Sequence, residues 1–186
     1  MSLTYSSMLP LGTKLIAFEL IDTVSEKNFS SDELEISKPT LIMFICNHCP
    51  YVKAVTKDIV EDCKKLKEIG INSVAICAND AENYPEDSFE NMIIFAKKHQ
   101  FNFPYLNDET QEIAKTYDAV CTPDFFGYNK NLELQYRGRL RELKNLIPVR
   151  EGESDLYKSM KQISETGKGP EKQIPSAGCG IKWKNN

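Results

Sequence analysis

Two cysteines with a histidine between them stand in the stretch CNHCP, residues 46–50. The stretch directly follows five apolar residues, 41–45, and precedes a helical pattern that includes Val52. A C-x-x-C at the entrance to a helix places sulfur near free backbone N–H groups and the positive end of the helix dipole, which favours the thiolate over the thiol. The spacing therefore predicts thiol–disulfide exchange.

The apolar stripe of this helix predicts a different role for each cysteine. The stripe extends back from Val52 to Cys49, so we expect Cys49 to point toward the core and Cys46 to be more accessible. Cys46 would then attack a substrate disulfide, and Cys49 would resolve the mixed disulfide. A protonated His48 would stabilise the Cys46 thiolate and lower its pKa.

The same pair is also half of a structural zinc site, so a metal-binding alternative stays open. Zinc normally takes a second close pair of Cys or His ligands, and this chain offers only Cys121 and Cys179 singly. The strand-then-helix context favours redox chemistry over metal binding and over two merely buried cysteines. We therefore expect no metal and no bound cofactor.

The composition is that of a soluble globular protein. The 186 residues are 41% hydrophobic and 27% charged, with a formal net charge of -4, which fits a single domain. No cluster of Lys and Arg offers a surface for nucleic acid, and no apolar run reaches the roughly 18 residues of a membrane span. The start of the chain has no secretion signal, so we expect a cytoplasmic protein whose six cysteines include redox or metal-binding ones.

Local patterns place the cysteine pair in an α/β fold. The apolar run 41–45 predicts a buried strand, the helical stripe ends near Gly70, and residues 71–77 predict a second buried strand. Together they imply a right-handed parallel crossover. Further patterns predict helices after Pro85, at about 109–117 and at about 155–163, with a hairpin of strands 125–128 and 132–136 between the last two. The order indicates a small sandwich with a mixed sheet.

Nearly the whole chain resembles the thioredoxin superfamily, and within it the peroxiredoxin-like alkyl hydroperoxide reductase/thiol-specific antioxidant group. The resemblance rests on LIMFICNHCPYVK at 41–53, VCTPDFFGYN at 120–129 and PSAGCGIKW at 175–183. It implies one thioredoxin-like domain over residues 1–186, a three-layer sandwich with a central mixed sheet flanked by helices and an N-terminal strand extension. Its core would span about 11–166, and 167–186 would be a C-terminal tail.

The resemblance also implies a loop beside the cysteine pair and a departure from peroxide chemistry. The Thr122-Pro123 bond would be cis, and its loop would offer the substrate a backbone platform. In this kind of alignment the peroxidatic position falls on Cys49, while Cys46 and Ile42 occupy the positions of the family's threonine and proline. The family's arginine falls around residues 121 and 122 and is also missing. Without these donors, fast peroxide reduction is not expected.

Several single residues remain. Arg137 and Arg139 lie beyond the hairpin and are expected to be solvated or ion-paired. Cys121, two residues before Pro123, would lie within several ångströms of the pair as an accessory thiol. Cys179, between two glycines, either reaches the site on a flexible tail as a further resolving thiol or is incidental to a tail that its apolar residues dock.

The predicted function is a thiol–disulfide oxidoreductase that works through a mixed disulfide at Cys46 and Cys49. Its substrate would be a disulfide-bearing protein or a small thiol compound, and a dithiol protein would reduce it. One alternative is a thiol peroxidase in which Cys49 forms the sulfenic acid and Cys46, Cys121 or Cys179 resolves it. The other is a non-catalytic binding or metal-holding protein, in which these same four cysteines converge as ligands. The sequence does not specify the oligomeric state.

Overall fold

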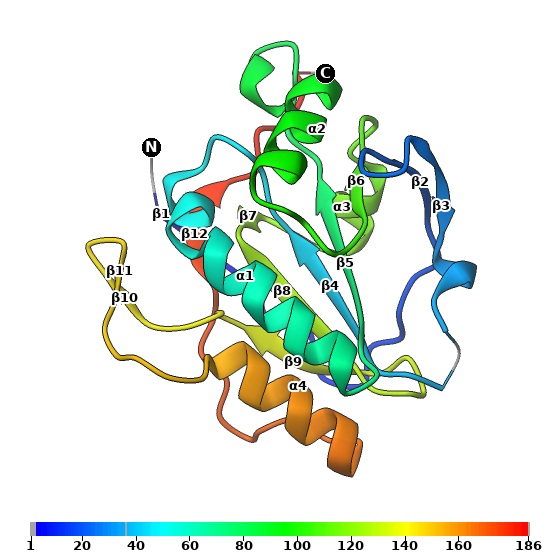
Figure 1. Cartoon of the computed structure of the whole chain (residues 1–186), viewed down its shortest axis with the longest axis vertical. Coiled ribbons are helices and arrows are strands. Elements are labelled where there is room, and N and C mark those ends of the chain that lie inside the picture. Colours follow the sequence, from blue (N-terminus) through cyan, green and yellow to red (C-terminus); the bar gives the residue numbers. More distant parts are fainter. Residues whose placement is uncertain (1–2, 36, 186) are drawn as a thin grey trace.

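The computed structural model describes residues 3–35 and 37–185. A mixed seven-stranded sheet forms its centre, in the order β3-β2-β6-β5-β4-β8-β9 (Figure 1). The three central strands run parallel: β4 (Thr40–Phe44), β5 (Asn72–Cys77) and β6 (Tyr105–Asn107). Antiparallel strands flank them: β8 (Asp124–Tyr128) and β9 (Leu134–Gly138) on one side, β2 (Glu19–Asp22) and β3 (Lys27–Ser30) on the other.

The predicted strand–helix–strand unit forms the middle of this sheet. All five residues of β4 are buried, as expected of a strand covered on both faces. Helix α1 (Pro50–Glu68) begins with a proline, whose missing N–H costs nothing in the first turn. The stripe that includes Val52 and Leu66 is buried against the sheet, and Gly70 follows the helix with a φ of 78°, where glycine is favoured.

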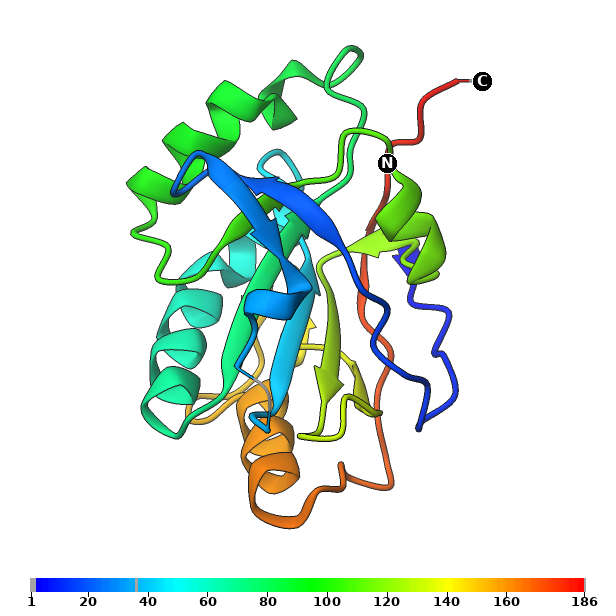
Figure 2. The ribbon, with the colours of Figure 1, turned by 90° about the vertical axis from the view of Figure 1, so that its right-hand side faces the viewer.

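Helices complete a three-layer sandwich. Buried residues of α1, α2 (Phe89–Lys98) and α4 (Asp155–Thr166) form one core cluster with one face of the sheet. Helix α3 (Glu112–Thr116) and apolar residues of the N-terminal segment pack on the opposite face (Figure 2). The thioredoxin-like fold predicted from the resemblance is confirmed. Among the described residues, no helix is long and apolar enough to cross a membrane.

A second, smaller sheet joins segments from both ends of the chain. Strand β12 (Ala177–Gly180) lies between β1 (Leu3–Tyr5) and β7 (Cys121–Thr122), antiparallel to both. The blue N-terminal and red C-terminal strands therefore run side by side (Figure 2). Residues 177–180 of the tail, which could have been flexible or docked, form a strand that is paired on both sides.

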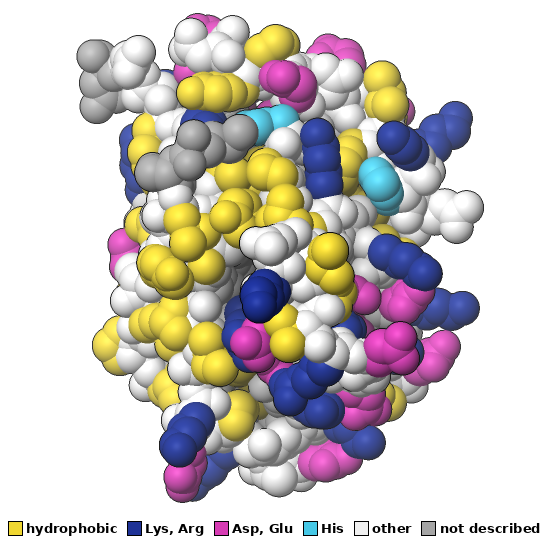
Figure 3. Space-filling model, turned by 90° about the vertical axis from the view of Figure 1, so that its left-hand side faces the viewer, with side chains coloured by type: hydrophobic (Ala, Val, Ile, Leu, Met, Phe, Trp, Pro, Cys, Tyr) yellow, Lys and Arg dark blue, Asp and Glu magenta, His cyan; other side chains and the backbone are white. Residues whose placement is uncertain are grey.

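One face of the molecule carries a group of exposed hydrophobic side chains. It carries β1, β12 and a short hairpin of β10 (Leu143–Lys144) and β11 (Ile147–Pro148), and yellow side chains gather over these elements (Figure 3). Tyr5 is 62% exposed and Ile147 is 67% exposed. The strand β12 of this face holds Cys179.

Candidate functional site

The two cysteines of CNHCP lie where β4 ends and α1 begins. Cys46 follows the strand by two residues, and Cys49 is the N-cap residue of α1. Both side chains are 0% exposed and belong to the core cluster between the sheet and α1. The expected burial of Cys49 is confirmed. The expected accessibility of Cys46 is wrong, because its sulfur contacts the β7 loop, 3.3 Å from Thr122 Oγ1.

A buried carboxylate that the sequence patterns did not single out holds the turn between the cysteines. Asp87 ends the 3-10 turn Pro85–Asp87, and its Oδ1 accepts from the backbone N–H groups of Asn47 (2.7 Å) and His48 (3.2 Å). Its Oδ2 accepts from Asn79 Nδ2 (2.7 Å) and bonds His48 Nδ1 (2.5 Å). The pKa of Asp87 is lowered, because these bonds outweigh the opposing effect of burial.

Cys49 is the thiol that the surroundings ionise. A hydrogen bond from the Cys46 thiol lowers the pKa of Cys49 to about 5, against the effect of burial. Hydrogen bonds from the Cys179 thiol and the backbone N–H of Val52 also contribute to this value. When protonated, Cys49 has an acceptor in the Thr122 carbonyl oxygen, 3.2 Å from its sulfur. Both protonation states of Cys49 therefore have partners.

Cys46 is held as a thiol, which differs from the expected Cys46 thiolate. Its hydrogen bond to Cys49 raises the pKa of Cys46 well above the usual value, and burial and the Asp87 charge raise it further. Two physical reasons explain the difference. The helix begins after Cys49, so its N-terminus serves that residue. The N–H groups of the turn, which would favour a Cys46 thiolate, are bound to Asp87.

His48 pairs with Asp87 rather than standing free between the sulfurs. The hydrogen bond to Asp87 raises the pKa of His48, although burial opposes it, and the charge of Cys49 raises it further. The ring stacks on Tyr84 with centroids 5.4 Å apart. Its Nε2 is buried and has no hydrogen-bond partner among the described residues. The imidazole is thus fixed by one nitrogen and leaves the other available.

The loop that the resemblance placed beside the pair is there. The Thr122-Pro123 bond is cis. Thr122 contacts both sulfurs, through its hydroxyl to Cys46 and its carbonyl to Cys49. The backbone of the same residue pairs with Cys179 in β12, so this short strand ties the cysteine pair to the tail.

The tail brings a third thiol into the site. Cys179 Sγ lies 2.9 Å from Cys49 Sγ, and the side chain of Cys179 is buried. Burial raises the pKa of Cys179 to about 12, and the hydrogen bond to Cys49 adds to this effect. The neighbouring Gly178 permits the approach, since a Cβ there would lie 1.9 Å from the Thr122 carbonyl oxygen. Both expectations for the tail hold in part, because Cys179 reaches the pair and Ile181 of the tail is buried in a core cluster.

The other cysteines are buried thiols. Cys121, next to Thr122, has a pKa raised by burial and by the charges of Asp124, Cys49 and Cys179. Burial raises the pKa of Cys63 to about 12 and raises that of Cys77 as well. Such protonated, inaccessible thiols are poor nucleophiles.

Arg137 is ion-paired but is not directed at the cysteine pair. Its side chain is 0% exposed, and Nη2 donates to Asp124 Oδ2 (3.0 Å) and to the Asp118 carbonyl oxygen (2.8 Å). The guanidinium packs over Phe126, which belongs to the core cluster on the sheet face opposite the cysteines. Arg137 was expected to be solvated or ion-paired, and the ion pair with Asp124 is confirmed.

One group of possible metal ligands converges among the described residues. Single ligand atoms of Cys46, His48 and Asp87 lie within 4.8 Å of one another. The imidazole and carboxylate atoms of this group already bind each other and backbone N–H groups, so the group is a hydrogen-bond network. The four cysteines of the metal-holding alternative form no such group in the described chain, and that alternative has no support from the geometry.

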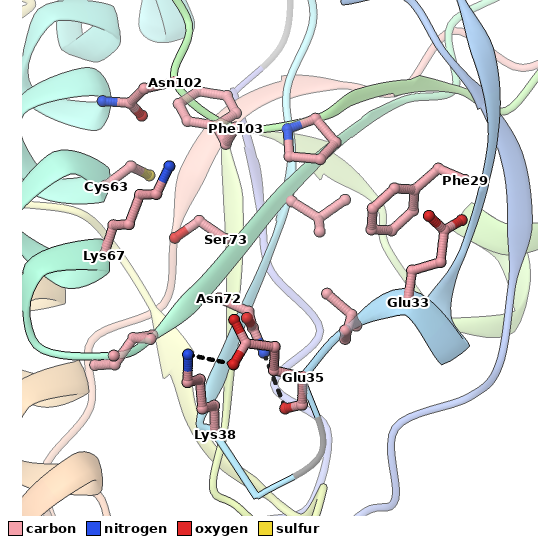
Figure 4. Close-up of a pocket in the computed structure, with 15 residues that line it drawn as sticks. Phe29, Glu33, Glu35, Lys38, Cys63, Lys67, Asn72, Ser73, Asn102 and Phe103 are labelled. Carbon is pink, nitrogen blue, oxygen red and sulfur yellow. Dashed lines mark hydrogen bonds and ion pairs between the residues drawn. The ribbon is translucent and has the colours of Figure 1, made fainter. Parts of the chain in front are cut away.

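A cavity of about 230 Å³ lies elsewhere, at the far end of α1 (Figure 4). Cys63 and Lys67, from the C-terminal half of the helix, face Phe29 and Phe103 across it. Neither cysteine of the pair lines this cavity. The redox chemistry of the pair therefore does not use it.

Residues 11–142 match the model of the AhpC/TSA family. The chain belongs to the AhpC/TSA family. It is also similar to a solved, uncharacterised conserved protein from Geobacillus kaustophilus, with 40% identity, 100% of this chain and 98% of that chain covered, and a TM-score of 0.91. A hypothetical protein from Sinorhizobium meliloti is 32% identical, with 98% and 100% covered and a TM-score of 0.91.

More distant structures share the fold of this AhpC/TSA protein. A secreted disulfide oxidoreductase from Mycobacterium tuberculosis is 21% identical, with 63% of this chain and 80% of that chain covered and a TM-score of 0.54. No curated protein matches the chain. Family membership supports redox thiol chemistry as the general function, and the type of reaction must be argued from the site.

Proposed function

We propose that this AhpC/TSA protein is a thiol–disulfide oxidoreductase in which Cys49 is the attacking sulfur. The observation that carries the proposal is the environment of Cys49. This residue is the N-cap of α1, its pKa is about 5, and it has two neighbouring thiols, Cys46 and Cys179. A thiolate is the nucleophile of exchange, and a nearby thiol is needed to release the product. The roles expected from the sequence are thus exchanged between Cys46 and Cys49.

The proposed reaction balances without a cofactor. The Cys49 thiolate attacks a substrate disulfide R–S–S–R′, forms a Cys49–S–S–R bond and releases R′–S⁻. Cys46 then loses its proton and attacks Cys49 Sγ, which forms the Cys46–Cys49 disulfide and releases R–S⁻. The substrate is reduced by two electrons and the protein is oxidised by two. A dithiol protein or a small thiol would restore the reduced pair.

We further propose that the disulfide belongs to a protein or to a small thiol compound. The buried sulfurs admit a small disulfide with less rearrangement than a protein disulfide. The hydrophobic face beside β12 (Figure 3) favours a protein. The reduction potential, measured in thiol–disulfide redox buffers, decides whether the pair reduces or oxidises its partner.

The experiment that tests the proposal is a mixed-disulfide trap. A variant with both Cys46→Ser and Cys179→Ser lacks the resolving thiols, so incubation with dithiobis(nitrobenzoate) should leave one thionitrobenzoate on Cys49. Intact mass and peptide mapping measure the adduct. Cys63→Ser, on the same helix but away from the site, is the matched control and should cycle normally. An adduct on Cys46 in the Cys179→Ser protein, or on Cys121 in either the Cys46→Ser or the Cys179→Ser protein, would refute the assignment if Cys49 were unmodified.

A thiol peroxidase is the second candidate, and one observation favours it. Cys49 combines 0% exposure with a low pKa, which suits a reactant as small as a peroxide. The opposing observation is that Arg137 is bound to Asp124 on the opposite sheet face, so this guanidinium does not contact a peroxide at Cys49. Peroxide consumption that is lost in Cys49→Ser but kept in Cys46→Ser, at a rate above that of disulfide exchange, would favour this candidate.

A further inference from the structure

The proposed reaction requires a proton acceptor for Cys46. Only a thiolate can attack the mixed disulfide on Cys49, yet Cys46 is fully buried and its pKa is raised well above the usual value. Its nearest hydroxyl, Thr122 Oγ1, lies 3.3 Å away and is not a base at neutral pH. Another group must therefore take the proton.

Capture of Cys49 makes this deprotonation easier at the moment it is needed. The largest cause of the raised pKa of Cys46 is its hydrogen bond to Cys49. In the mixed disulfide Cys49 is neutral, so it is no longer a thiolate that accepts a hydrogen bond from the Cys46 thiol. Burial and the charges of Asp87 and Cys77 still oppose ionisation of Cys46, so a base close to the sulfur is required.

His48 and Asp87 form an imidazole–carboxylate pair close to Cys46, and the imidazole Nε2, which has no hydrogen-bond partner among the described residues, is the nitrogen left to accept a proton. Asp87 Oδ2 bonds His48 Nδ1 at 2.5 Å, and Asn79 and the turn backbone hold the carboxylate in place. The Cys46 sulfur lies within 4.8 Å of an imidazole nitrogen and a carboxylate oxygen of this pair. An imidazole oriented by a carboxylate is an effective proton acceptor from a nucleophile.

The imidazole has Tyr84 stacked on it and the Cys46 sulfur nearby, and charged groups act on it from other elements. Asp87 faces it from the 3-10 turn, Cys49 from the start of α1, and Lys182 from the segment after β12. Asp87 and Cys49 favour the imidazolium, whereas Lys182 and burial oppose it. When Cys49 is captured, the imidazolium loses one of its supporting charges, so more neutral imidazole is present in the mixed disulfide than in the reduced protein.

We propose that His48 is the catalytic base that accepts the proton of Cys46 during resolution, and that Asp87 is the positioning residue that orients and charges it. The inference rests on the proposed function. In this step the Cys46 thiol, the neutral imidazole of His48 and the mixed disulfide Cys49–S–S–R become the Cys46–Cys49 disulfide, the imidazolium form of His48 and R–S⁻. The imidazolium then returns the proton to R–S⁻, which leaves as R–SH. No electron donor beyond the two cysteines is required.

One reagent separates this inference from the proposed function. In the Cys179→Ser protein, dithiobis(nitrobenzoate) releases a first thionitrobenzoate when Cys49 attacks and a second when Cys46 resolves. Stopped-flow absorbance gives the two rate constants, and loss of the first phase would contradict the proposed function itself. Replacement by His48→Gln should lower the ratio of the second rate constant to the first by about a hundred-fold, the usual scale of acid–base catalysis.

The titration of the histidine rings supplies a second test. The chain has two histidines, so proton NMR resolves both titrations, with His99 as the internal reference. In Asp87→Asn the His48 midpoint should fall by about 1–3 pH units, the usual effect of removing a close opposite charge. The pH dependence of the second phase should fall with it. Asp80→Asn, in the same loop but bonded to Asn83 and the Glu82 N–H, is the matched control and should change neither.

Two results would overturn the proposal. One is an unchanged ratio of rate constants in folded His48→Gln protein. The other is a second phase whose pH midpoint, in the protein with Asp87 intact, bears no relation to the midpoint of His48 measured on the mixed disulfide. The second result is decisive even if Asp87→Asn does not fold.

Discussion

Cys49 Sγ lies 2.9 Å from Cys179 Sγ, although 130 positions separate the two residues in the chain. The Cys49 sulfur can therefore form a disulfide with either of two thiols, Cys46 on the same turn or Cys179 on the docked tail. The two disulfides exclude each other, because each uses the Cys49 sulfur. Which disulfide forms depends on how readily Cys46 loses its proton and on how readily β12, which carries Cys179, moves.

A disulfide between the tail and the helix is the first expected outcome. In Cys46→Ser protein, mild oxidation should join Cys49 to Cys179, because no nearer thiol competes. Non-reducing peptide mapping identifies the linked peptides. Adding Cys121→Ser to the Cys46→Ser protein should leave this product unchanged. A Cys121–Cys179 link in the Cys46→Ser protein, in place of the Cys49–Cys179 link, would contradict the arrangement.

The reactivity of Cys49 should depend on pH at an unusually low value. A pKa lowered to about 5 keeps the thiolate above that pH and protonates it below. The rate of the first phase with an aromatic disulfide should therefore rise through about pH 5 and level off near neutrality. A rate that still rises as pH exceeds about 8, as for an ordinary thiol, would contradict the assignment.

The donor responsible can be tested with a matched pair of variants. Cys46→Ser keeps an X–H donor for Cys49, whereas Cys46→Ala removes it. The largest cause of the lowered pKa of Cys49 is the bond from Cys46, so the midpoint of the first phase should rise more in Cys46→Ala. Equal midpoints would show that Cys46 is not the donor responsible and that Cys179 and the start of the helix lower the pKa of Cys49.

The close approach at Gly178 predicts a strong effect of a single methyl group. An added Cβ would lie 1.9 Å from the Thr122 carbonyl oxygen, so Gly178→Ala should displace β12 and destabilise the protein by about 1–3 kcal/mol. Urea unfolding measures the loss, and faster alkylation of Cys49 reports the displacement. At Gly180, a Cβ would meet Thr4 Oγ1 at 3.2 Å, so Gly180→Ala should cost less. Equal losses would contradict this prediction.

The buried ion pair on the opposite face predicts a pH-dependent loss of stability. Arg137→Met leaves Asp124 without its cation and should cost about 3–5 kcal/mol. Burial already raises the pKa of Asp124 to about 6. A raised folded-state pKa means that stability is lost as pH rises through it, so urea unfolding should show a larger loss at about pH 8 than at about pH 5. Adding Asp124→Asn should recover part of the loss, and no recovery would refute the pairing argument.

The strand–helix–strand unit and the position of the cysteine pair were predictable, because periodicity over 41–77 is strong and local. Even the ionised cysteine had a signal. Pro50 is favoured at the first helical position, which makes Cys49 the N-cap. The sequence interpretation instead took Cys46 as the residue at the helix entrance.

Asp87 and the neighbours of Cys179 could not be predicted in the same way. Asp87 reaches the CNHCP turn from 39 and 40 positions away, and one acidic residue in a loop carries no periodic pattern. Strand β12 has four residues, two of them glycine, and pairs with strands of two and three residues. Strands this short lack the alternation from which pairing is inferred.

The small sheet of β1, β12 and β7 has a consequence for kinetics. It assembles from the two ends and the middle of the chain, so its contacts are among the least local in the molecule, and such contacts form late in folding. Few buried apolar residues support β1, and regions of this kind open while the rest of a protein stays folded. The observed rate with a bulky substrate is then the intrinsic rate of Cys49 multiplied by the fraction of molecules with this sheet open. Substitutions at Leu3 or Tyr5 would change this rate through that fraction as well as through contacts on the hydrophobic face.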